Sequence, residues 1–375
     1  MAATSAFAQS SVTLSGNLDQ TYYNASGVRK FIHNGNSTSL IAISGEEGLG
    51  GGQKTKFNLV SELNLMAGQV GANSTGSATA ANGKTENNGQ VADMFNRGAN
   101  VTFEDAQFGG VTIGRQTDSW FSTSGSFNTA GSASMGSGTT LSYVGNTAAI
   151  GSVTSFTAAT HLPGYAVGTN GNNAVNTGNT GTAAQVFKSG IGYTSPTVSG
   201  LTFHYLNGQQ TRSDNTNYGN SWSLNYTNGP LKAGYAVTDS KDANGDSAWK
   251  NTFVGGSYTY GQYTLIANTN STVFGGTAAA VASLTASAIG LNYKLNDKVD
   301  FNVNQASIKD SGTNKGTITG VTGRYNVSKR TQFYAGYGKA KNEGATMNIG
   351  AVYGGTAAGV GTTASSVMAG LKHTF

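Results

Sequence analysis

Segments of about ten residues that alternate between apolar and polar side chains follow one another along the chain from about Ser10 onward. In the first segment, Val12, Leu14, Leu18 and Tyr22 share one face, and the residues between them are mainly polar. Side chains alternate across a β-strand, so each segment predicts a strand with one apolar and one polar face. The chain therefore predicts an all-β fold. The same alternation recurs within residues 222–226, 231–235, 289–295, 299–303 and 321–327.

The composition favours paired strands. Of 375 residues, 55 are glycine, only 3 are proline and 10% are charged, whereas about 25% charged residues is usual for globular domains. No run of 18 apolar residues occurs, which excludes a membrane-spanning helix. A closed barrel is the other way to cross a membrane, because every backbone polar group must find a partner within the protein. Periodicity alone does not exclude a soluble β-sandwich.

The spacing of the connections favours a closed antiparallel transmembrane β-barrel over a sandwich. Membrane barrels have even strand numbers, with short turns at one end and long loops at the other. Here seven short connections alternate with eight long polar ones, which predicts sixteen strands. The short connections are 48–52, 107–110, 195–200, 228–230, 260–262, 296–297 and 328–330, and the long ones are 24–38, 68–95, 118–187, 211–217, 240–248, 274–283, 310–316 and 342–364.

Both ends of the chain fit this interpretation. Residues 1–8 end in Ala-Phe-Ala, the small-x-small pattern that signal peptidase recognises, so we expect them to be the remnant of an export signal. Residues 9–375 then form a single barrel domain. In the last segment Phe375 is in register with Leu371 and Val367. We expect this segment to pair with the first strand and close the barrel without an exposed edge.

Motifs for other functions are weak. The four histidines, His33, His161, His204 and His373, lack metal-ligand spacing, and the chain has no cysteine. The net charge of +5 is spread out, which argues against a nucleic-acid partner. Residues 239–246 lack the spacing of a calcium loop, and the glycines at 48–52 lack that of a nucleotide site. We therefore expect no enzymatic activity and no cofactor.

Eight segments are distinctive in their order and spacing: QSSVTLSGNLD, GEEGLGGGQKTKF, MFNRGANVTFE, FGGVTIGRQ, GYTSPTVSGL, YTNGPLKAGY, GRYNVSKRTQFYAGY and GLKHTF. Together they resemble the trimeric Gram-negative porins of the betaproteobacterial type over residues 9–375. The resemblance implies a homotrimer in the outer-membrane lipid, in which each sixteen-stranded barrel is a general diffusion channel for ions and small hydrophilic solutes. It also implies that the long third loop, within 118–187, folds into the lumen as a constriction.

The chain departs from that family in three places. Leu40 and Ser44 stand where the second strand of anion-selective relatives carries lumen-facing arginines. The third loop of the family carries acidic side chains, but residues 119–187 contain no charged residue. Residues 139–160 could add a strand pair and give eighteen strands. We expect sixteen, because GYTSPTVSGL matches the family's sixth strand.

Charged side chains on the inward parity are the candidate pore-lining residues. They are Lys54, Lys56, Glu62, Lys188 and Arg324, with further inward positions at Asn58, Lys232, Lys294 and Lys372.

Arg97 and Arg115 join this set because they stand at the family's arginine positions, although both fall on the apolar parity of their strands. Charges on a pore wall enrich counter-ions. Because most of these residues are basic, we expect a weak anion preference. A substrate-specific channel remains an alternative function. An adhesin-like β-helix would require a short repeat that is not visible.

Overall fold

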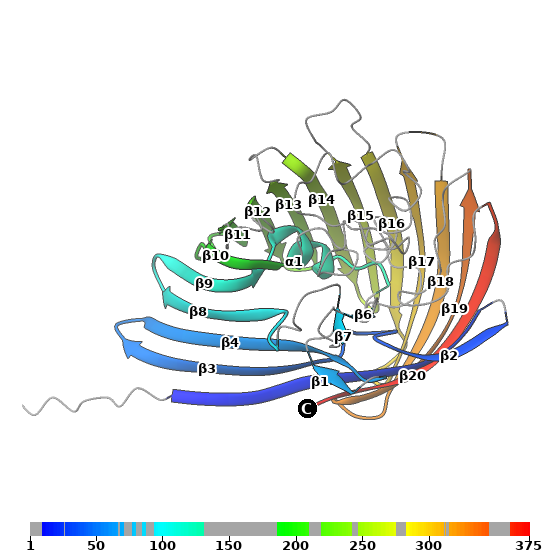
Figure 1. Cartoon of the computed structure of the whole chain (residues 1–375), viewed down its shortest axis with the longest axis horizontal. Helices are drawn as coiled ribbons and strands as arrows, with labels where there is room; N and C mark the ends of the chain where they lie inside the picture. Colours follow the sequence, from blue (N-terminus) through cyan, green and yellow to red (C-terminus); the bar gives the residue numbers. More distant parts are fainter. Residues whose placement is uncertain are drawn as a thin grey trace, which may run out of the picture.

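Sixteen antiparallel strands form a closed ring in the computed structural model (Figure 1). The structure describes residues 10–25, 27–66, 68–70, 77–79, 85–87, 94–130, 186–209, 219–241, 247–274, 283–310, 312, 315–344 and 361–375. The ring strands are β1 (Ser10–Ala25), β3 (Leu40–Gly50), β4 (Gln53–Asn64), β8 (Gly98–Asp105), β9 (Gly109–Thr117), β10 (Val186–Thr194), β11 (Leu201–Gly208), β12 (Gly219–Asn228), β13 (Leu231–Lys241), β14 (Ser247–Tyr260), β15 (Tyr263–Phe274), β16 (Ser283–Lys294), β17 (Val299–Asp310), β18 (Lys315–Asn326), β19 (Thr331–Glu343) and β20 (Thr363–Thr374).

The ring closes at β1. The first half of β1 pairs with β3 and its second half pairs with β20, so the chain's first and last strands are neighbours, as predicted. Gly16 and Phe375 exchange two backbone hydrogen bonds of 3.0 Å at this seam. A closed ring satisfies the edge groups that an open sheet would expose to lipid.

Four short strands among the described residues lie outside the ring. β2 (Val28–His33) adds to the end of β1, and β5 (Gln69–Val70) adds to the end of β4. β6 (Ser77–Thr79) and β7 (Thr85–Asn87) form a separate hairpin. Residues 139–160, considered for an extra strand pair, lie outside the described residues. In the described ring β9 pairs directly with β10.

The two faces of the wall differ in chemistry. Large apolar side chains such as Leu224, Val254 and Ile289 are exposed on the outer face, and Ser223, Asn251 and Asn302 are buried on the inner face. Tyr263 and Tyr293 stack on neighbouring strands near the short turns, with ring centroids 4.9 Å apart. Aromatic residues at this level are typical of the interface girdle of membrane barrels.

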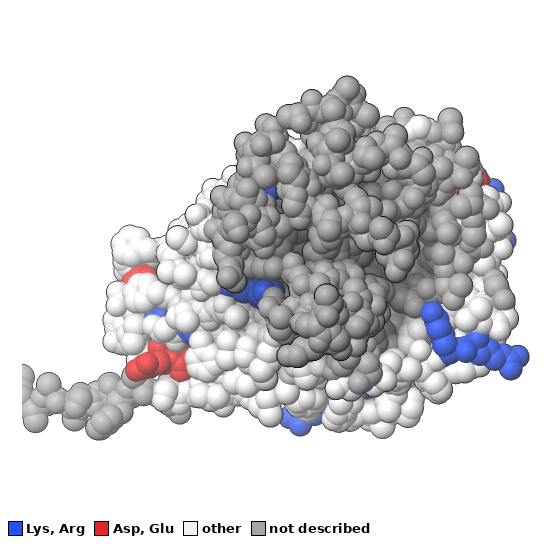
Figure 2. Space-filling model, in the orientation of Figure 1, with Lys and Arg blue, Asp and Glu red and all other residues white. Residues whose placement is uncertain are grey.

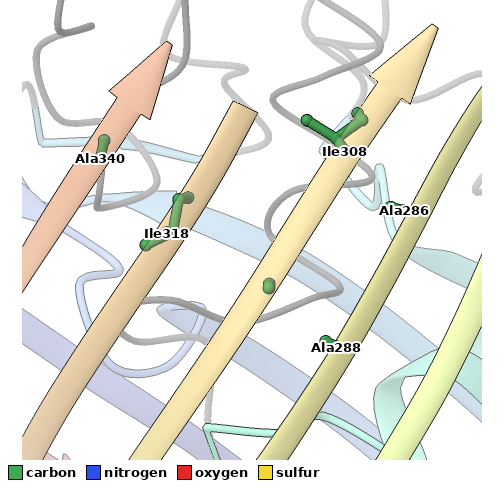
Figure 3. Close-up of a cluster of buried hydrophobic side chains, with 6 residues drawn as sticks. Ala286, Ala288, Ile308, Ile318 and Ala340 are labelled. Atoms are coloured by element: carbon green, nitrogen blue, oxygen red, sulfur yellow. The ribbon is translucent and has the colours of Figure 1, made fainter. Parts of the chain in front are cut away.

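The inner face is not uniformly polar. On β16 to β19 a patch of small and branched apolar side chains faces inward, as Figure 3 shows. Their positions alternate with exposed residues, so they belong to the inner face despite their chemistry. The patch consists of Ala286, Ala288, Ala306, Ile308, Ile318 and Ala340.

The one α-helix among the described residues, α1 (Ser119–Ser126), follows β9 and contacts β11 to β14. It is far too short to cross a membrane, and no helix in the described parts of the chain is long and apolar enough to do so. Its contacts lie on the polar face of these strands, which places α1 inside the ring. The predicted constriction loop, 118–187, is described only at residues 118–130 and 186–187.

Candidate functional site

Two lysines predicted to face the lumen form a four-charge cluster with two glutamates. Lys54 Nζ lies 3.6 Å from both Glu46 of β3 and Glu104 of β8, and Lys56 Nζ lies 2.5 Å from Glu104. All four side chains are at least one third exposed. Figure 2 shows red and blue atoms close together over the turn ends of these strands. The cluster of Lys54, Lys56, Glu46 and Glu104 therefore has no net formal charge.

Glu62 and Arg97 form a second, more buried ion pair. Arg97 Nη2 and Nε lie 2.7 and 2.9 Å from one Glu62 carboxylate oxygen, and Asn34 donates to the other at 3.1 Å. Arg97 precedes β8, where the chain is not yet a strand, so strand parity does not fix its direction. Its guanidinium also lies 5.7 Å from the ring of Phe121 in α1. A cation over an aromatic face at this distance is attracted to it.

Arg115 lies on β9 near the Arg97 pair. It donates to the backbone oxygen of Asn96 at 3.0 Å, and the Asn96 side chain accepts from the backbone nitrogen of Glu62 at 2.9 Å. Arg115 shares the parity of the exposed Ile113, so its strand position faces outward. Lys188 lies in β10 at a break in the strand register, and its side chain is outside what the structure describes.

Arg324 joins three strands to the segment that follows α1. Its Nε bonds to Asp300 of β17, and its Nη2 lies 3.4 Å from Asn292 of β16. Its Nη1 donates to the backbone oxygen of Ala130 at 3.2 Å. The Arg324 side chain is only 10% exposed. Arg324 therefore anchors the segment after α1 to the wall, and little of its side chain is exposed to the lumen.

Residues 118–130 are seated on the inner wall by specific contacts. Trp120, fully buried, donates to Asn270 of β15. Asn268 donates to the backbone oxygen of Phe127, and Asn302 donates to that of Thr129, both at 2.8 Å. Because these partners lie on β15 and β17, the segment runs along the wall rather than away from it.

Glycines on the wall make room for this segment. A Cβ on Gly234 of β13 would lie 2.5 Å from the Phe127 ring, and one on Gly290 of β16 would lie 2.0 Å from the Thr129 backbone oxygen. Real Cβ atoms do not approach other atoms so closely. The absence of side chains at Gly234 and Gly290 is thus a condition for the observed path of the segment.

Asp118 caps the N-terminus of α1. Its carboxylate accepts a hydrogen bond of 2.6 Å from the backbone nitrogen of Phe121, as N-cap residues do. Complete burial raises the pKa of the Asp118 carboxyl well above its usual range, and the hydrogen bond only partly opposes this. The adjacent Ser119 bonds to Ser221 and, at 2.7 Å, to Nδ1 of His204. Asp118 therefore positions α1 with the help of two wall strands.

A cavity of about 410 Å³ lies between α1 and the strands β3, β4, β8 and β9. Asn58, Asn100 and Gln116 line it with amide groups, and Arg97 and Phe121 are also part of its lining. Hydroxyl groups of threonines complete the lining. Such a wall can hydrogen-bond water and small polar solutes. No group of three or more metal-ligating side chains occurs in the described part of the chain.

Strand parity in the sequence did not identify the acidic partners of Lys54, Lys56 and Arg324. Glu46 lies directly across from Lys56, and Glu104 directly across from Lys54, on neighbouring strands. Asp300 lies directly across from Arg324. The inward parity of each acid was visible in the sequence, but pairing it with a given lysine or arginine requires the strand register. The register across β4 and β8 depends on strands separated by the long segment 65–97.

Comparisons with known proteins agree with this architecture. A family model described as Gram-negative porin matches residues 1–345. The fold is similar to an anion-selective porin from Comamonas acidovorans, with a TM-score of 0.72, 21% identity, and coverage of 98% of this chain and 100% of that one. It is also similar to OmpT of Vibrio cholerae, at a TM-score of 0.63, 13% identity and 98% coverage of both chains. A search of curated protein sequences gave no match.

Proposed function

The chain belongs to the Gram-negative porin family, and we propose that it is a general diffusion porin that passes ions and small hydrophilic solutes. As a member of that family it is an outer-membrane protein with a channel fold. The observation that carries the proposal is the ring of sixteen strands with an apolar outer face and a largely polar inner wall. Water and polar solutes can be accommodated along such a wall, whereas lipid contacts the outside.

We infer weak ion selectivity with a slight anion preference. Lys54, Lys56, Arg97 and Arg324 all lie within ion-pair distance of a glutamate or aspartate, which cancels most of their field at a distance. Lys232, on the inward parity of β13, has no acidic partner within 4 Å in the described residues. The anion-selective porin from Comamonas acidovorans has the same fold, which is compatible with this preference and does not require it.

A substrate-specific channel is the second candidate. The cavity beside α1 favours it, because Phe121, Arg97 and several amides meet in one place and could select a solute by shape and hydrogen bonding. A general porin instead discriminates by size and charge. The two candidates therefore differ in how permeation depends on the chemistry of the solute.

Permeation through reconstituted protein tests the proposal. Swelling of proteoliposomes in a series of uncharged sugars of increasing mass should slow smoothly with size, and single-channel conductance should rise in proportion to salt. Stereoisomeric sugars of equal mass should enter at equal rates. Entry of one isomer that is faster and saturates at high concentration would contradict general diffusion and support the second candidate.

We propose that the porin assembles as a homotrimer. The structure of OmpT from Vibrio cholerae in its trimer form shares this fold at 13% identity, which supports the proposal by similarity of fold alone.

A further inference from the structure

Residues 34–39 interrupt the strand that pairs with β1. β2 and β3 follow one another along β1 (Figure 1). β2 ends with His33 opposite Gln20, and β3 begins with Leu40 opposite Asn17. Only two residues of β1 lie between these two pairs, whereas six residues lie between His33 and Leu40. The surplus has to leave the plane of the wall, as extra residues do in a β-bulge. We call residues 34–39 the strand bulge.

The strand bulge turns into the lumen. The backbone nitrogen of Ser37 donates to the carboxylate of Asp19 at 2.9 Å, and Asp19 is fully buried. A Cβ on Gly35 would lie 2.2 Å from Oγ1 of Thr21. Asp19 and Thr21 alternate with the exposed Tyr22, so both lie on the inner face of β1. The bulge therefore covers the lumen side of this strand.

Polar contacts fix the strand bulge to strands on both sides of β1. Asn36 donates to Gln332 of β19 at 2.9 Å, which takes it across β20. Asn34 donates to Glu62 of β4 at 3.1 Å. The side chain of Asn34 also accepts from the backbone nitrogen of Ser39 at 2.6 Å, which holds the two ends of the bulge together. The bulge is thus held across the inner wall from β19 to β4.

The strand bulge lies at the same depth as the segment that follows α1. Arg324 of β18, which donates to the backbone oxygen of Ala130, lies directly across from Tyr334 of β19. Tyr334 donates at 2.6 Å to Asp19, the residue that also holds Ser37 of the bulge. Neighbouring residues on β18 and β19 therefore hold one end of each segment.

Glu62 connects the two segments on the other side of the lumen. It accepts from Asn34 at 3.1 Å and lies 2.7 Å from Arg97, whose guanidinium is 5.7 Å from the ring of Phe121 in α1. Thr38 of the bulge and Phe121 both line the cavity of about 410 Å³. The bulge and α1 therefore border the same cavity.

The two segments share the inner circumference between them. Residues 118–130 contact the wall from β11 to β18, and the strand bulge contacts it from β19 to β4. We propose that the strand bulge is a second constricting element of the pore, which limits conductance and solute size together with residues 118–130. Residues 34–39 carry no charge, so the bulge should restrict size without affecting ion selectivity. This inference rests on the proposed channel function.

Deletion of residues 35–38 tests the proposal in the full-length chain. Asn34 and Ser39 could then pair with the two bypassed residues of β1, and removal of an even number of residues preserves which face each side chain occupies. Single-channel conductance in planar bilayers should rise by about half or more, because the narrowest part of the pore limits conduction. Larger uncharged sugars should enter proteoliposomes, and the reversal potential in a salt gradient should stay unchanged.

Gly35→Ala should have the opposite effect on conductance. Its methyl group meets Thr21, so the strand bulge has to move away from β1 and farther into the lumen. Conductance should therefore fall below the wild-type value. Gly48→Ala is the matched control, because a Cβ on this glycine of β3 would meet nothing within 4 Å.

Thiol labelling provides a measurement that does not require the deletion variant to fold. The chain contains no cysteine, so Thr38→Cys introduces a single thiol. A neutral, hydrophilic methanethiosulfonate reagent added to the open channel should lower its conductance in one step per subunit. Ser328→Cys, at an exposed short turn, should be labelled without a change in conductance. Mass spectrometry of each variant verifies that the reagent has reacted.

Two results would overturn the proposal. One is wild-type conductance in a deletion variant that migrates as a folded, heat-modifiable barrel, which would give the strand bulge a role in stability alone. The other is unchanged conductance after complete labelling of Thr38→Cys. A wild-type protein without any conductance would instead contradict the proposed channel function, and the second constriction would fail with it.

Discussion

Cross-strand ion pairs set the charge of the inner wall residue by residue. Lys54 and Lys56 share Glu46 and Glu104, and all four side chains are at least one third exposed. Exposed pairs of this kind contribute little to stability, because solvent screens them. Their consequence is electrostatic: substitution of one member changes the local charge by a known amount without removing a buried partner.

Lys56→Glu should therefore move the reversal potential in a salt gradient toward cations. The cluster changes from two lysines and two glutamates to one and three. Because the Debye length is about 8 Å at physiological salt, the shift should grow as the salt is diluted. Lys56→Gln should give roughly half the shift, since it changes the charge by one unit rather than two. Lys339→Gln, on the outer face, should give none.

A wild-type channel that is already cation-selective in dilute salt would contradict the proposed slight anion preference. It would mean that Glu46, Glu104 or acidic residues outside the described part control the pore.

One glycine permits the polar contact that ties β19 to β1. Tyr334 of β19 lies over Gly370 of β20 and donates to the buried Asp19 of β1 at 2.6 Å. A Cβ on Gly370 would lie 2.2 Å from the Tyr334 hydroxyl oxygen. The three strands are adjacent at the closing seam, so this bond spans the strand between them.

Gly370→Ala should consequently destabilise the barrel by about 1–3 kcal/mol, because the added methyl displaces the Tyr334 hydroxyl from Asp19. A lower midpoint of thermal unfolding in detergent would report this. Tyr334→Phe keeps the ring and loses the hydrogen bond, so it should account for part of the same loss. A Gly370→Ala variant as stable as the wild type would show that the seam tolerates the displacement.

At the scale of elements, the segment 118–130 depends on the wall beneath it. Gly290→Ala places a methyl group against the Thr129 backbone oxygen, so the segment must move away from β16. We expect a change in single-channel conductance and more frequent fluctuations, with the barrel itself intact. Gly323→Ala is the matched control, since its Cβ would meet only ordinary contacts of 3.4 Å on the outer face. Identical conductance in Gly290→Ala and the wild type would show that the position of this segment does not affect permeation.

The strand β20 gives a second prediction at this scale. Phe375 exchanges two backbone hydrogen bonds with Gly16, and its ring occupies the space beside Gly16 that a Cβ would fill. Deletion of Phe375 removes all three contacts at the junction of β1 and β20. The yield of folded, heat-modifiable protein in the outer membrane should fall several-fold, because closure removes the exposed edges. The yield of Phe375→Leu, which retains the backbone contacts, should fall less. An unchanged yield after deletion of Phe375 would contradict this role.

The elements of the ring could be predicted from sequence because strand period and turn spacing are local properties. The seam between β1 and β20 was predicted for the same reason, from the apolar register of Phe375, Leu371 and Val367. The inward charges at Lys54 and Arg324 could be placed by parity, but their acidic partners could not, because register across strands depends on long loops. Arg97 was ambiguous because it lies just outside β8, where parity has no meaning. The position of α1 and the residues after it depends on Gly234 and Gly290. No local sequence pattern shows that another segment packs closely against a given glycine.

At the scale of the whole molecule, the outer face has to satisfy both lipid and neighbouring subunits. A closed symmetric assembly uses the same pair of patches on every copy, so part of the outer face of each barrel can stay in contact with lipid in a ring of three.

The last prediction is therefore the proposed homotrimer. Native mass spectrometry in mild detergent should show a species of about 115 kDa, three times the chain mass of 38.2 kDa. Heating should first separate it into folded monomers, because each barrel is closed by its own backbone hydrogen bonds. A 38.2 kDa species alone would contradict the trimer.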